Sequence, residues 1–203
     1  MNNTLSATEI SELVCTRISH DLIGNIGAVA NAVELLEEGD MDFMDDIRSI
    51  LKVSSGVLTA RLKFFRMVFG VDNANLEKLD LVEKTTADYL QTLGNVRYPI
   101  RLTMKLNSWQ LSKMAMLAVM ILADTFIKGG NIEVCEETGR LLILTEGENR
   151  STEKICAIAD AVKGKLIERT AQYAPIFYLQ ELLNKFKLNL NIIEDKGFGL
   201  CIE

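Results

Sequence analysis

The sequence predicts an α-helical hairpin over residues 1–72, followed by an α+β sandwich over residues 73–203. Two observations lead to this fold class. In the first part, apolar residues recur every three to four positions along two long stretches, as on one face of a helix. Beyond the polar link at 71–75, shorter apolar runs alternate with glycine-containing turns, which is typical of helices and strands packed in layers. We therefore expect a hairpin domain and a second, mixed domain.

A first helix is predicted over residues 7–38. Ser6 followed three positions later by Glu9 has the form of a capping box, which marks a helix start. Gly39-Asp40 then breaks the helix. Its apolar stripe consists of Cys15, Ile18, Leu22, Ile26, Val29, Val33 and Leu36.

A second helix is predicted over residues 43–70, with Gly70 as its C-terminal cap. Two long helices joined by so short a connection must lie antiparallel. A lone hairpin cannot cover both apolar stripes, so we expect a four-helix bundle made by two hairpins, most simply in a homodimer. The second apolar stripe consists of Phe43, Ile47, Leu51, Ser54, Leu58, Leu62, Phe65 and Phe69.

The second part is predicted to fold as a mixed sheet with helices covering one face. Its turns are marked by Gly94, by Gly129-Gly130 and by the run at 137–140. The expected helices span 77–93, 109–127, 151–162 and 174–187. The expected strands span 100–106, 132–136, 141–145, 188–193 and 199–202.

The composition excludes several classes of function. No stretch approaches the roughly 18 apolar residues of a membrane span, and the N-terminus lacks the layout of a signal peptide, so we expect a cytoplasmic protein. The net charge of −6 argues against nucleic acid as a partner. With one histidine and no CxxC motif, neither a zinc site nor disulfides are indicated. The scattered cysteines are Cys15, Cys135, Cys156 and Cys201.

The single histidine, His20, lies on the outward face of the first helix, about 160° from the centre of the apolar stripe. The same face carries Gly24, Gly27 and Asn31, and so has little side-chain bulk. Glycine within a helix costs about 0.5–1 kcal/mol relative to alanine, so two of them need a reason. Either a partner protein docks closely at this face, or a second helix packs against it.

Two segments of the hairpin resemble a known family. HDLIGNIGAVANAVELL at 20–36 and RLKFFRMVFG at 61–70 are similar to the matching helices of ChpT-type histidine phosphotransferases of alphaproteobacteria. The run GGNIEV at 129–134 also falls where that family has it. The whole order of elements resembles the dimerisation hairpin and ATP-binding domain of sensor histidine kinases. Where the family has a small hydroxyl residue and a proline, this chain has Gly24 and Asn25.

The resemblance implies a phosphotransferase that acts through phosphohistidine at His20. It would take a phosphoryl group from the receiver domain of a hybrid kinase and pass it to a response regulator, with cell-cycle regulators as the family's targets. Neutral imidazole is a competent nucleophile for such a transfer. We expect no cofactor and no metal site in the chain itself, because the partner receiver would supply Mg²⁺.

The sequence also indicates that ATP is not used. A kinase needs asparagine on the helix after the first core strand, and glycine-rich loops around the phosphates. The expected helix 109–127 has no asparagine, and the strand at 141–145 is followed by Glu146-Gly147-Glu148-Asn149. Carboxylates at that position would repel a triphosphate.

Asp21 and several further residues are candidates around the histidine. The Asp21 carboxylate either orients the imidazole or is simply solvated, since neighbours in sequence do not face each other on a helix. Basic side chains would attract an acidic receiver pocket. The expected docking surface consists of Arg17, Gly24, Asn25, Gly27, Asn31, Arg61 and Arg66.

Two other functions stay open. The chain could be a non-catalytic adaptor or kinase inhibitor that uses a degenerate kinase fold, in which case His20→Gln would leave its function intact. It could also be an ATP-dependent histidine kinase, in which case nucleotide would protect it against thermal unfolding.

Overall fold

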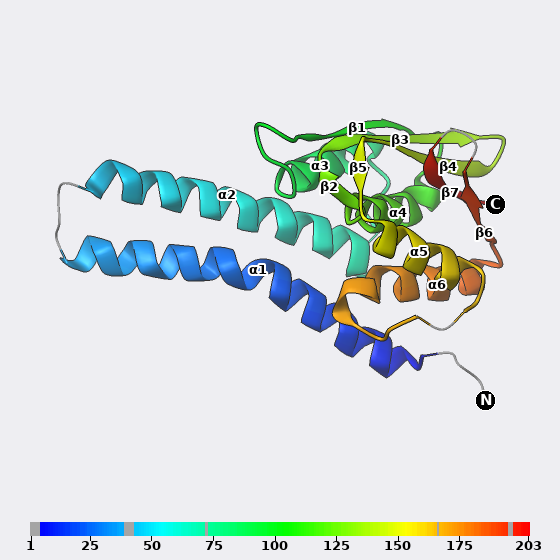
Figure 1. Cartoon of the computed structure of the whole chain (residues 1–203), viewed down its shortest axis with the longest axis horizontal. Helices are drawn as coiled ribbons and strands as arrows, with labels where there is room; N and C mark the ends of the chain where they lie inside the picture. Colours follow the sequence, from blue (N-terminus) through cyan, green and yellow to red (C-terminus); the bar gives the residue numbers. More distant parts are fainter. Residues whose placement is uncertain (1–4, 39–42, 72, 166, 195–196) are drawn as a thin grey trace.

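The computed structural model describes residues 5–38, 43–71, 73–165, 167–194 and 197–203. Helices α1 (Ala7–Glu38) and α2 (Met44–Phe69) form the predicted antiparallel hairpin, which projects from a mixed body (Figure 1). The predicted break at Gly39-Asp40 lies outside the described residues. At the start of α1, the Ser6 N–H donates to Glu9 Oε2 at 2.8 Å and the Glu9 N–H donates back to Ser6 Oγ at 3.2 Å, which confirms the capping box.

The body contains a five-stranded sheet in the order β1-β3-β4-β7-β6, in which only β1 and β3 run parallel among the pairs described. This confirms the predicted fold class. The helices are α3 (Leu79–Gln91), α4 (Ser112–Ala123), α5 (Thr152–Val162) and α6 (Ala174–Phe186), with 3₁₀ turns η2 (Trp109–Leu111) and η3 (Ala171–Tyr173). The strands are β1 (Ile100–Lys105), β2 (Phe126–Lys128), β3 (Gly130–Glu137), β4 (Arg140–Glu146), β5 (Asn149–Arg150), β6 (Leu190–Ile193) and β7 (Phe198–Ile202).

One predicted helix is wrong in extent. The segment 109–127 begins with the 3₁₀ turn η2, and its last residues form β2, which pairs with the unpredicted strand β5. Thr125 makes the change, because its N–H bonds to the Leu122 carbonyl while its own carbonyl accepts from the Ser151 N–H at 2.7 Å. Residues 114–123 are all apolar, so the period that separates helix from strand could not be read from this part of the sequence.

Helix α4 forms the centre of the body. Every residue from Ser112 to Ala123 except Lys113 is buried, between the sheet and α6. The sheet turns alternate side chains toward it, among them Ile132 and Val134 of β3. Figure 1 shows the helices of the body gathered on the side of the sheet that faces the hairpin.

The base of the hairpin shares this core. Phe65 of α2 is buried, as its place in the apolar stripe predicted, and so is Phe64, whose ring stacks on the Tyr89 ring of α3 with centroids 3.9 Å apart. Helix α1 contacts α6 and η3 along its first turns. The far half of the hairpin has no such cover, so apolar side chains remain exposed there. They include Ile23, Ile26, Val33, Leu36, Phe43, Ile50 and Val53.

Candidate functional site

His20 lies on α1 next to Asp21 and projects into solvent. Its side chain is 82% exposed, so the imidazole is open to a partner. Nδ1 lies 3.4 Å from Oδ1 of Asp21, a long approach for a hydrogen bond. The Nε2 side of the ring has no hydrogen bond to any described residue. The geometry therefore presents one ring nitrogen outward and turns the other toward a carboxylate.

The Asp21 carboxylate is held inside the structure rather than solvated. Its side chain is 14% exposed, and Oδ2 accepts a hydrogen bond from Arg17 Nε at 2.8 Å. The main-chain carbonyl of Asp21 accepts a second one, from Arg61 Nη1. Two arginines thus fix the residue next to the histidine.

Arg17 corrects one prediction. It is not an exposed docking residue, because it is 8% exposed and its guanidinium is turned into the body. Nη1 and Nη2 donate to the two carboxylate oxygens of Asp124 at 2.8 and 3.0 Å, and Nη1 also donates to the Gln172 carbonyl. Burial alone would lower the pKa of Arg17, but Asp124 and Asp21 outweigh it and raise the pKa. The angular position on the helix was correct, but the sequence did not reveal that α4 and η3 cover that side.

Arg61 corrects a second prediction. Besides the Asp21 carbonyl, it donates through Nε to Thr92 Oγ1 at 3.0 Å and through Nη2 to the Thr92 carbonyl at 3.1 Å. Its guanidinium therefore ties α1 to the end of α3 and is not directed at a partner. Arg66, by contrast, is exposed and remains a candidate for docking.

The surface beyond His20 is open. A Cβ atom added at Gly24 or at Gly27 would meet no other atom within 4 Å. A second helix of the described chain therefore does not pack there, and close packing within the protomer is not the reason for these glycines. Asn31 is exposed and Asn25 is half-buried on the same stretch of helix.

Tyr89 of α3 lies near the charged groups of Arg17, Asp21 and Asp124. Its hydroxyl is buried and has no hydrogen-bond partner among the described residues. Burial, and then the negative charge of Asp124, raise the pKa of Tyr89, so the phenol stays neutral. Its ring packs α3 against α2.

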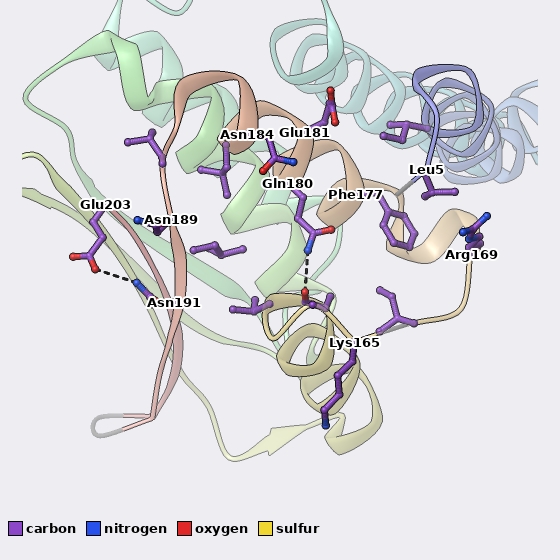
Figure 2. A pocket seen from close by; sticks show the side chains of 18 residues that line it. Leu5, Lys165, Arg169, Phe177, Gln180, Glu181, Asn184, Asn189, Asn191 and Glu203 are labelled. Atoms are coloured by element: carbon purple, nitrogen blue, oxygen red, sulfur yellow. Dashed lines mark hydrogen bonds between the residues drawn. The ribbon is translucent and has the colours of Figure 1, made fainter. Parts of the chain in front are cut away.

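Away from His20, the described part of the chain carries a large cavity but no cluster of metal ligands. No three His, Cys, Asp or Glu side chains converge there as metal ligands, and no described helix is long and apolar enough to cross a bilayer. A cavity of about 770 Å³ lies between α5, α6 and β6, away from His20 (Figure 2). Labelled side chains around it include Gln180, Asn184, Asn189 and Lys165.

Sequence reasoning missed the role of Asp124. The residue is the single acidic position of the apolar segment 109–127, and a carboxylate in such a segment needs a buried partner. That signal could have marked it. Which cation would reach it, 107 positions away in the chain, could not be read from the sequence.

Comparisons with known proteins bear on the family of the chain rather than on single site residues. A model of the histidine phosphotransferase C-terminal domain family matches residues 82–197. Protein phosphotransferase ChpT of Brucella abortus (strain 2308) is 46% identical over 67 residues, which are 33% of this chain and 31% of that protein. The match thus spans about a third of the curated relative. A solved bacterial phosphotransferase has a TM-score of 0.79 at 25% identity, with 98% of both chains covered.

Proposed function

This chain belongs to the histidine phosphotransferase family, and on that basis we propose that His20 relays a phosphoryl group between the receiver domain of a hybrid kinase and a response regulator. The observation that carries the proposal is the 82% exposed imidazole with one nitrogen facing solvent. It is the single histidine of the chain, so no other residue could serve as a phosphohistidine.

The proposed transfer proceeds by attack of Nε2 on the phosphorus of an aspartyl phosphate. The N–P bond forms while the P–O bond to the donor breaks, and the electron pair leaves with the donor's carboxylate. The Nδ1 proton stays on the ring, so phosphorylation leaves a positive charge there that the Asp21 carboxylate stabilises. A carboxylate of the second receiver then attacks phosphorus and restores neutral imidazole.

We propose that the chain supplies neither metal nor nucleotide to this reaction. The Asp21 carboxylate beside His20 already bonds to Arg17, which leaves it a poor Mg²⁺ ligand, so the ion would come with the receiver. Three features support the absence of ATP from the reaction: the side chains of α4 are buried, Glu146 at the end of β4 and Glu148 just after it are exposed, and the cavity beside Asp124 measures about 20 Å³. That volume is about enough for one water molecule.

We further propose that two copies pair through the far half of the hairpin, in the cytoplasm where receivers are found. The exposed apolar side chains of this half of α1 and α2 support this, because a large exposed apolar patch marks an interaction site. A second hairpin would cover it as a four-helix bundle. The partner that fits this face is therefore a second copy of the chain.

Phosphotransfer from a phosphorylated receiver domain tests the relay. Acid-labile label should appear on the wild-type protein and be absent from the variant His20→Gln, with an ATP-only reaction as the control. Label from ATP alone would contradict the nucleotide-independent relay and point to a kinase. Tight receiver binding without label would point to an adaptor.

A further inference from the structure

We propose that Arg17, held by Asp124, is a positioning residue that keeps the Asp21 carboxylate against Nδ1 of His20. The inference rests on the proposed role of His20 as the phosphoryl acceptor. It assigns to the body of the protein a direct part in orienting the histidine, since Asp124 is the C-terminal cap of α4.

Helix geometry alone does not orient Asp21. Adjacent residues on a helix point about 100° apart, so Asp21 does not turn toward His20 by itself. Arg17 stands four positions before Asp21, on the same face, and its Nε holds Oδ2 at 2.8 Å. With that oxygen held, Oδ1 lies 3.4 Å from the imidazole Nδ1.

Arg17 is itself held in place. A lone arginine at i,i+4 would be a flexible partner, but this guanidinium also forms a two-bond fork with Asp124, at 2.8 and 3.0 Å. The side chains of Arg17, Asp21 and Asp124 are 9%, 14% and 18% exposed. A network so shielded from water and so fully bonded has one arrangement, which it imposes on Asp21.

Stability does not explain the charged residues at this junction. Apart from the exposed ion pair of Glu9 with Arg169, α1 also meets the body through apolar contacts such as Ile10 and Val14 against Ala174. A buried ion-pair network gives little net stability over apolar packing of similar volume. A need to fix the Asp21 side chain beside the His20 imidazole does explain the presence of the network.

The backbone is held from the opposite side. Arg61 of α2 donates to the Asp21 carbonyl and to Thr92, so the helical turn that carries His20 is tied to α3 as well. The side chain and the main chain of Asp21 are thus fixed by different arginines. Small displacements of a reacting group slow a reaction strongly, and this explains why both the side chain and the main chain of Asp21 are fixed.

The tautomer of the imidazole gives a direct test. In free histidine the neutral ring favours the Nε2–H tautomer, whereas a carboxylate at Nδ1 favours Nδ1–H and leaves the Nε2 lone pair for attack. Long-range ¹H–¹⁵N spectra at alkaline pH distinguish the two forms, and the single histidine gives one unambiguous set of signals. We expect the Nδ1–H form to dominate in the wild-type protein.

Three variants then remove the hold in different ways. Asp124→Asn removes the charge that anchors Arg17, Arg17→Lys keeps a cation but loses the fork, and Asp21→Asn removes the carboxylate itself. Each should return the tautomer ratio toward that of free histidine and slow phosphotransfer about tenfold or more, with His20 still accepting label. The matched control is Arg169→Gln, which removes another contact between the body and α1, to Glu9, and should change neither.

The outcomes separate this inference from the proposed function. The tautomer is measured without a receiver or phosphate. Positioning of Asp21 by Arg17 can therefore be shown even if His20 relays no phosphoryl group, and the relay can be shown even if Arg17 does not position Asp21. A free-histidine ratio in the wild-type protein, or an unchanged ratio in Asp21→Asn or in Arg17→Lys, overturns the inference. Circular dichroism shows whether each variant is folded, and if Asp124→Asn unfolds, Arg17→Lys still tests the inference because it keeps a cation between the two carboxylates.

Discussion

The two sides of His20 along α1 differ sharply. On the N-terminal side, Arg17 is buried and bonded to α4 and η3, and the helix packs on α6. On the C-terminal side, Gly24 and Gly27 have open space where a side chain would be, and apolar residues such as Ile26 are exposed. The same helix is therefore part of the core at one end and a bare surface at the other.

One helix can thus hold a reactive group firmly and still offer it to large partners. Rigidity comes from the side that is packed, where α1 shares contacts with the body of the protein. Access comes from the side that lacks bulk. The histidine lies at the boundary, and substitutions on either side of it should have effects of different kinds.

The largest effect is expected on the far half of the hairpin, where apolar side chains are exposed. Val53 is 62% exposed on α2, and Val53→Asp would place a charge in the proposed interface twice, once from each copy. At roughly 2 kcal/mol per copy, dimer dissociation should become about a thousandfold easier. Analytical ultracentrifugation measures this, and the exposed Arg48→Ala serves as control. A wild-type protein that is a well-folded monomer at nanomolar concentration would contradict the bundle.

The next effect is expected on the packed side. Arg17→Ala leaves the carboxylates of Asp21 and Asp124 without their counter-charge, which should lower the free energy of unfolding by about 3 kcal/mol. Urea denaturation measures it. Removing the exposed ion pair of α2 by Arg48→Ala should change stability by less than about 0.5 kcal/mol. Equal losses of unfolding free energy in the two variants would contradict a larger role for the buried ion pairs of Arg17.

Two substitutions of Gly24 distinguish an effect on stability from an effect on docking. Gly24→Ala fits without contact and should raise the free energy of unfolding by up to about 1 kcal/mol, as should Gly56→Ala on α2. Gly24→Leu should keep that gain but slow transfer from a phosphorylated receiver, because its side chain fills the space a partner needs. If Gly24→Leu transfers at the wild-type rate, the open face is not the docking surface.

The smallest effect concerns the start of α1. Hydrogen bonds from Ser6, the main-chain one first, lower the pKa of Glu9 in the folded protein. A carboxyl group with a lowered pKa contributes its stability above the unfolded value of about 4.3 and loses it as pH falls through the folded value. Acid unfolding curves of wild type and Glu9→Gln should therefore differ slightly near neutral pH and converge below about pH 4. Curves that stay apart in acid would contradict a role for the ionised box.

Local patterns were enough to predict most of the fold. The capping box, the helical period of α1 and α2 and the turn at Thr138-Gly139 all act within a few residues, and the structure confirms each. The helix at 109–127 failed because a buried segment is apolar on every side and carries no period. The division into domains at 72 stays a prediction, since that residue lies outside the described ones and the core continues across the junction.

Local spacing was sufficient to place a single histidine outward on a long helix beside two glycines, because helical geometry follows from neighbouring positions alone. The surroundings of that histidine depended on contacts between distant segments. Arg17 and Arg61 looked like docking residues, yet both are bonded inward, to Asp124 and to Thr92. The angle of a residue on its helix tells which way a side chain points, and what covers that face is set by residues far away in the chain.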